Sequence, residues 1–300
     1  MINDALEKQL QLIDTWGSPK GKNWAEMMHG QIMEEEGAAP KEKEIGAMYI
    51  HELMNAEPFY VADNICDIIS ASLESLPYLP LYEDMLPAQS CWFYFDKPFD
   101  ILGIDGITPK LQAFCCEKIT TVKKALTTNS NVSGDGISIT FYETVGQEIY
   151  PIANSIWNFG FDYHHFRTFL GEPLKRTVNV QIENMVKVVF AAFSFLRQKL
   201  FITASQSVDR AARKRYQKRF DHEAPIIRTV VLRKAEHIKN DSTKHKDIEW
   251  SCQWFVRGHF RQQYYRSDKT HRAIWIMPYA KGPSGKPFKK AGVSLFVVNR

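Results

Sequence analysis

The sequence has few cysteines and no long apolar run. Its five cysteines are odd in number and form no C-x-x-C pair, which argues against a disulfide framework. We therefore predict reduced thiols and a cytoplasmic protein. The uncharged run at 188–196 is far shorter than the roughly 20 residues that a membrane span needs. No basic segment followed by an apolar one opens the sequence, so no signal peptide and no membrane association are predicted.

Several motifs that would indicate a cofactor or a metal are also missing. No glycine-rich loop has the spacing of a dinucleotide-binding or phosphate-binding loop. His51-Glu52 begins like the zinc-protease motif H-E-x-x-H, but Asn55 stands where the second histidine belongs. The adjacent His164 and His165 point apart on either a helix or a strand. We therefore predict no cofactor and no metal site.

Charge is divided very unevenly along the chain. Residues 1–150 contain 10 basic and 23 acidic side chains, whereas residues 151–300 contain 28 basic and 11 acidic ones. Nucleic acid is the commonest partner of a basic half. The alternative is that the two halves pair with each other and otherwise face solvent.

Periodicity predicts helices first and strands later. Helical spacing of apolar residues indicates helices at about 3–16, 23–36, 42–55 and 58–74, followed by strands at 91–95, 111–116 and 136–142. The segment 177–202 has one charge, Lys187, between Met185 and Leu196, which predicts a long helix buried in a core. Four further strands are expected at 226–234, 247–263, 272–279 and 293–298, paired antiparallel through short loops.

These elements predict an α+β protein in four regions. We expect an acidic helical region at 1–87, a β-rich region at 88–175, the buried helix with a basic helix at 176–220, and an antiparallel β module at 221–300. The buried helix is expected to pack against the C-terminal sheet.

The densest charge cluster lies directly after the buried helix. Six basic residues fall within ten positions: Arg210, Arg213, Lys214, Arg215, Lys218 and Arg219. On a helix they would cover most of the circumference, which suits contact with a phosphate backbone. The alternative is a solvated connecting helix.

The predicted strand at 247–263 has the clearest alternation in the chain. An apolar face carries Trp250, Cys252, Trp254, Val256 and Phe260. The opposite face presents Arg257, His259 and Arg261 in a row. This row has three interpretations: a phosphate grip, a catalytic row with His259 as acid or base, or a polar sheet face paired with carboxylates of the acidic half. Residues 266–271 are predicted as the loop of the following hairpin.

The same stretch carries a resemblance. The chain resembles a C-terminal module in proteins of actinobacterial genomes, bacteriophages and other mobile elements, for which we know no activity. The residues that carry it are Val256-Arg257-Gly258-His259-Phe260-Arg261, Ile274-Trp275-Ile276, Pro278, Lys281-Gly282-Pro283 and a final strand ending at Arg300. The members typically have Trp where this chain has Phe260. The resemblance covers about the last hundred residues, more loosely 91–99 and 136–142, and implies a mobile-element setting without implying an activity.

Two functions follow as hypotheses. The first is a phage-type or mobile-element-type cytoplasmic binding protein. Its basic half would contact nucleic acid or a nucleic-acid-handling partner, including host defence machinery. A homo-oligomer belongs to the same hypothesis. The second is a metal-independent enzyme acting on nucleic acid or nucleotides through Arg257, His259 and Arg261. We favour the first.

Overall fold

The computed structural model describes residues 2–36, 41–76, 81–101, 108–119, 135–159, 164–168, 175–198, 201–221, 223–232, 251–256, 258–276, 279–283 and 286–287. The chain forms two compact units, Met1–Arg233 and Lys234–Arg300. Within the described residues, no helix combines the length and the apolar character that crossing a membrane requires.

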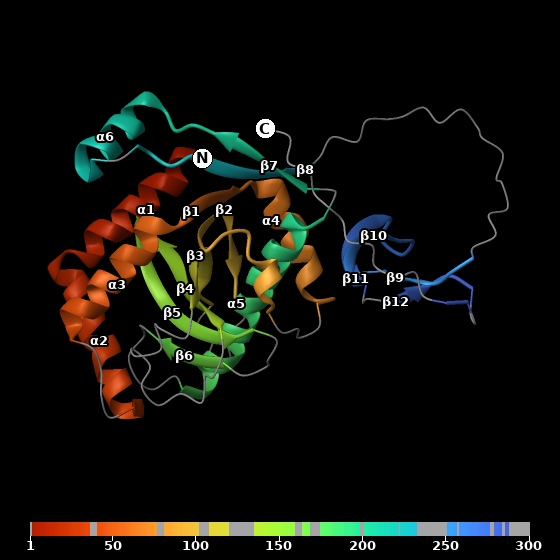
Figure 1. The fold of residues 1–300 in the computed structure, drawn as a ribbon, viewed down its shortest axis with the longest axis horizontal. Helices are drawn as coiled ribbons and strands as arrows, with labels where there is room; N and C mark the ends of the chain where they lie inside the picture. Colours follow the sequence, from red (N-terminus) through yellow and green to blue (C-terminus); the bar gives the residue numbers. More distant parts are fainter. Residues whose placement is uncertain are drawn as a thin grey trace. The chain divides into compact units, whose positions relative to one another are not determined.

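One mixed sheet organises the first unit (Figure 1). Its strands are β1 (Glu57–Val61), β2 (Ser90–Asp100), β3 (Lys110–Ile119), β4 (Gly136–Val145), β5 (Glu148–Asn158), β6 (His164–Thr168), β7 (Phe201–Gln206) and β8 (Ile227–Leu232). They lie in the order β6-β5-β4-β3-β2-β1-β8-β7. Strand β1 is parallel to both of its neighbours, β2 and β8. The remaining pairs are antiparallel, and a single sheet therefore joins strands from 57–61, 90–168 and 201–232.

Three helices cover one face of this sheet: α1 (Ile2–Trp16), α2 (Pro19–Glu36) and α3 (Glu42–Asn55) (Figure 1). Aromatic rings join them, because Trp16 stacks on Tyr49 with ring centroids 4.4 Å apart and meets Trp24 edge-on at 5.0 Å. The indole N–H of Trp92 on β2 donates a hydrogen bond to the carbonyl of Ala5, at 2.9 Å. This bond fixes α1 against the sheet.

Helices α4 (Asp63–Leu73) and α5 (Lys175–Leu196) cover the other face (Figure 1). Phe193 of α5 is fully buried, and its ring centroid lies 5.8 Å from that of Phe93 and 6.0 Å from that of Phe114. The prediction of a buried central helix is confirmed. The helix is shorter than predicted, because Phe201 begins strand β7. Its β partner within the first unit is this large sheet. Its expected packing on the C-terminal sheet stays a prediction.

Two more expectations need correction. Residues 58–61 were predicted to begin a helix but form β1. The strand predicted at 226–234 joins the large sheet as β8 instead of pairing with the later C-terminal strands. Strand β1 lies between β2 and β8 and is buried along nearly its whole length. A short strand covered on both faces has no polar–apolar alternation, so its pattern does not distinguish it from a helical segment.

The second unit consists of two small antiparallel sheets in its described part. Strand β10 (His259–Tyr265) pairs with β11 (Thr270–Ile276), and β9 (Trp254–Val256) pairs with β12 (Tyr279–Lys281). The single strand predicted at 247–263 is therefore divided between two sheets. The strand predicted at 293–298 lies outside the described residues. With helices concentrated in the N-terminal part and an antiparallel hairpin in the C-terminal part, the α+β class is confirmed.

Candidate functional site

The predicted basic cluster forms helix α6 (Arg210–Phe220). Asp209 caps the start of this helix, since its carboxylate accepts a hydrogen bond from the backbone N–H of Ala212 at 2.7 Å. Asn3 of α1 donates to the other oxygen of the same carboxylate at 2.6 Å. The helix ends at Asp221, whose φ of 54° is left-handed. An eleven-residue helix is marginal alone, so α6 depends on its packing against the first unit.

One side of α6, its inner face, binds α1. It consists of Ala212, Arg215, Tyr216 and Arg219, which recur at helical spacing. Ala212 is buried in the core that α1–α3 share with the sheet, and Tyr216 packs against that core. Arg215 forms an ion pair with Glu7 at 2.7 Å, and Arg219 pairs with Asp14. Ion pairs at this exposure contribute at most about 1 kcal/mol each, so they orient α6 more than they stabilise it.

The other side of α6, its outer face, carries the remaining four cations. Arg210, Lys214 and Lys218 follow one another at i, i+4 and i+8, and Arg213 flanks them. All four side chains are exposed. None of the four has an ion pair with any residue that the structure describes. The six predicted phosphate-binding residues therefore divide into two that hold the helix in place and four that face solvent.

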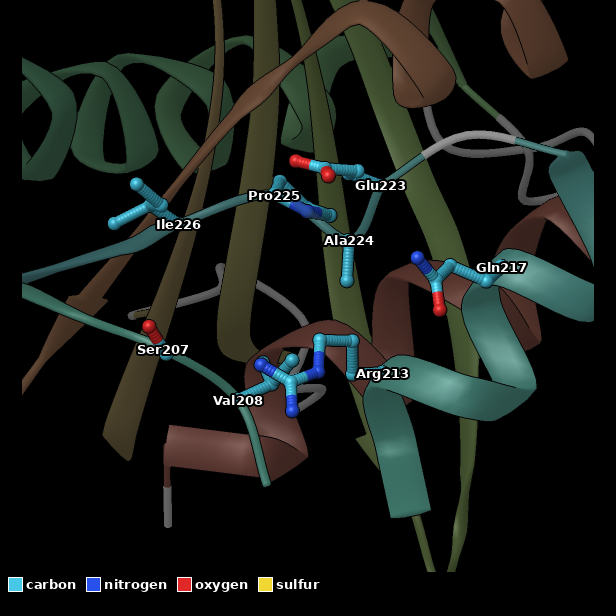
Figure 2. A pocket seen from close by; sticks show the side chains of 8 residues that line it. All are labelled: Ser207, Val208, Arg213, Gln217, Glu223, Ala224, Pro225 and Ile226. Carbon is cyan, nitrogen blue, oxygen red and sulfur yellow. The ribbon is translucent and has the colours of Figure 1, made fainter. Parts of the chain in front are cut away.

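A pocket of about 410 Å³ lies beside α6 (Figure 2). Figure 2 shows the side chain of Gln217 extending from α6 toward Ala224, and that of Arg213 extending toward Val208. The lining residues are Ser207, Val208, Arg213, Gln217, Glu223, Ala224, Pro225 and Ile226. A second hollow of about 370 Å³ shares Pro225 and Ile226 with the first and is bordered by Arg228. Arg228 is paired with Glu57 at 2.7 Å. An arginine thus borders each hollow, and the exposed Ile226 lies between them.

The structure describes two of the three residues of the predicted Arg-His-Arg row. Arg257 lies outside the described residues. His259 and Arg261 lie two residues apart on β10 and therefore share one face of the β10–β11 hairpin. His259 is partly buried, whereas Arg261 is exposed and donates a hydrogen bond to Gln263 at 2.5 Å. The catalytic interpretation of this row stays a prediction.

Other residues of the resemblance motif hold the small unit together. Phe260 is buried and meets Trp275 edge-on, with ring centroids 4.9 Å apart. Gly282 has a φ of 121°, and a Cβ there would lie 2.7 Å from the carbonyl oxygen of Cys252. The backbone at 282 therefore requires glycine. Gln253 donates a hydrogen bond to the carbonyl of Pro283 at 2.8 Å, which joins the residue before β9 to the segment after β12.

Buried cysteine thiols lie in the core of the first unit. Burial raises the pKa of the Cys115 and Cys116 thiols well above the ordinary value, and it raises the pKa of Cys66 to about 11. These three thiols are protonated near neutral pH and therefore poor nucleophiles. Across the described ranges, no group of three or more His, Cys, Asp or Glu side chains is placed to hold a metal ion.

No family model matches the chain, and no curated protein matches it. Among solved structures, the chain is similar to the crystal structure of AcrVA2. The sequence identity is 12% and the TM-score is 0.36, over 92% of this chain and 98% of that chain. A TM-score this low does not establish a shared fold.

The sequence interpretation missed a second group of exposed side chains, at the free end of the β10–β11 hairpin. Tyr264 and Tyr265 are 45% and 36% exposed. The guanidinium of Arg272 lies 5.2 Å from the ring centroid of Tyr265. The signal was present in the sequence as two adjacent tyrosines beside a basic loop. Their exposure follows only from the pairing of the two strands.

Proposed function

We propose that the protein binds nucleic acid through the outer face of α6, formed by Arg210, Arg213, Lys214 and Lys218. The observation that carries this proposal is the division of the six cations on α6. Arg215 and Arg219 are neutralised by Glu7 and Asp14 of α1, and the outer four have no acidic partner among the described residues.

The dimensions of α6 agree with this ligand. Eleven residues at about 1.5 Å each give a helix about 16 Å long. Each strand of a duplex presents one phosphate about every 3.4 Å along the helix axis, so a helix of this length lying along that axis spans about five phosphates of one strand. Contacts of this kind supply affinity and orientation but carry no sequence information. We therefore expect binding with little sequence preference.

The uneven charge of the chain is consistent with this division. Part of it is internal, because acidic α1 pairs with the inner face of α6. The outer face of α6 carries the basic side chains that this internal pairing does not neutralise. The phage or mobile-element setting belongs to the same proposal and rests on the C-terminal motif alone. A nucleic-acid-handling protein with an acidic surface is the other partner that this face would suit.

The test is a salt titration of binding to a duplex of about 20 base pairs, followed by fluorescence anisotropy. In the outer-face variant, Arg210, Arg213, Lys214 and Lys218 are all replaced by Gln. Each phosphate contact contributes about 0.9 to the slope of log K against log[salt], so we expect the slope to fall by between about 3 and 4. Between 50 and 200 mM salt, the affinity of the natural protein would then change roughly a hundredfold more than that of the variant.

The matched control replaces four exposed lysines elsewhere in the first unit: Lys22, Lys43, Lys97 and Lys110, each by Gln. It removes the same net charge. A local interface predicts that the control retains most of the affinity and slope. Equal losses in both variants would show that only net charge matters, and unchanged binding in the outer-face variant would refute the site. No binding by the natural protein would direct the search to an acidic protein partner.

A further inference from the structure

The β10–β11 hairpin has two different faces, which are fixed by its register. Phe260 is paired with Trp275 and Gln262 with Ala273, and Phe260 and Ala273 are buried. The opposite face carries Arg261, paired with Ile274, and Gln263, paired with Arg272. Arg261 and Arg272 are both exposed. One face therefore carries the buried Phe260 and Ala273, and the other, called the open face, carries the exposed cations Arg261 and Arg272.

The open face ends in an ordered arrangement of a ring and a cation. Arg272 lies over the ring of Tyr265 and is held by Asp268 at 2.5 Å. The ring of Tyr265 is thus held in place by a cation and is partly exposed to solvent. On the other face of the same end, Tyr264 lies 5.0 Å from His271, ring centroid to ring centroid. Two exposed tyrosines therefore lie at the same end of the hairpin, one on each of its faces.

The charge around these rings is strongly positive. Arg261, Arg266, Lys269 and Arg272 are all exposed, and the one acidic residue in β10, β11 and the turn between them is Asp268, which pairs with Arg272. Aromatic faces beside cations are the combination that binds unpaired nucleotides, because bases stack on the rings while the cations contact the phosphates. In a duplex the base faces are already stacked on each other and are not available to such rings.

We propose that this hairpin end is a binding site for single-stranded nucleic acid, separate from the outer face of α6. Tyr265 on the open face stacks with a base, and Arg261, Arg266 and Lys269 contact the backbone. The site deepens the proposed function and rests on it for the class of ligand. It belongs to a different compact unit, so the two sites are tested independently.

The experiment compares the full chain with Tyr265→Ala and Tyr265→Phe. The probes are a labelled oligothymidylate and a labelled oligouridylate of about 20 nucleotides, with a duplex of equal length as the third probe. Stacking on one ring predicts a loss of about 5- to 150-fold in single-strand affinity for Tyr265→Ala. Tyr265→Phe keeps the aromatic face and should stay within about twofold of the natural protein. Duplex affinity should not change in either variant.

Three outcomes decide the question. Unchanged single-strand binding by Tyr265→Ala would overturn the site, as would an equal loss in the Phe variant, which would indicate a role for the hydroxyl instead of the ring. If polyglutamate competes as well as the oligothymidylate, the hairpin binds acidic polymers in general. This result would also overturn the proposed single-strand site. The outer-face variant of α6 serves as the cross-test. Loss of duplex binding in that variant, with single-strand binding retained, would separate this site from the α6 site.

Discussion

Replacing Phe193 by alanine tests whether α5 and the sheet enclose one packed core. The ring is fully buried and makes edge contacts with Phe93 and Phe114. Truncating a buried Phe to Ala removes its transfer free energy and leaves a cavity, which together cost about 3–5 kcal/mol. Natural domains are stable by roughly 5–15 kcal/mol, so the variant should lose a large fraction of its stability.

The assay is urea unfolding followed by tryptophan fluorescence, since Trp92 and Trp157 are fully buried and report on the loss of the core. With a slope of about 2–3 kcal/mol per molar urea, the midpoint should fall by between about 1 and 2.5 M. The control is Ile202→Ala, whose side chain is 40% exposed and whose loss should cost less than about 1 kcal/mol.

A double-mutant cycle with Phe93→Ala sharpens this result. Edge-to-face ring pairs contribute about 0.5–1.5 kcal/mol beyond their buried area, so a coupling energy in that range is expected between positions 93 and 193. A loss below about 1 kcal/mol for Phe193→Ala would refute the enclosed core. A coupling energy of zero would refute the ring contact while leaving the burial intact.

Two further predictions concern the surface of the first unit. Asp209→Ala removes the cap of α6 and should lower the free energy of unfolding by about 1 kcal/mol, whereas Asp209→Asn should retain most of it; equal melting temperatures for Ala and the natural residue would contradict the cap. Glu148 accepts hydrogen bonds from Lys20 and Tyr150. These bonds, the one from Lys20 most strongly, hold the pKa of the Glu148 carboxylate below its ordinary value. This stabilisation exists above the unfolded-state pKa and is lost as pH falls through the folded-state pKa. Denaturation of the natural protein and of Glu148→Gln should therefore differ at pH 7 and converge as pH falls below the ordinary glutamate pKa of about 4.3. A difference that persists at strongly acidic pH would contradict this role of Glu148.

The sequence by itself determined those elements whose residue pattern is complete within one segment. Helix α3 has the predicted bounds, Glu42–Asn55, because its apolar spacing and flanking residues are local. The burial of α5 was predictable from a run with one charge, because no polar side is left to face water. The basic cluster was equally visible as a local run of charge.

Only the tertiary structure decided which segments lie together. Strand β1 pairs with β8, about 170 residues away along the chain. The sequence of neither segment indicates which strand it pairs with. The division of the α6 cations depends on Glu7 and Asp14, which reach them through the packing of α1. The exposed tyrosines of the hairpin depend in the same way on the register of β10 with β11. Charge and apolar pattern are properties of a segment, whereas the partner that buries or neutralises them is a property of the fold.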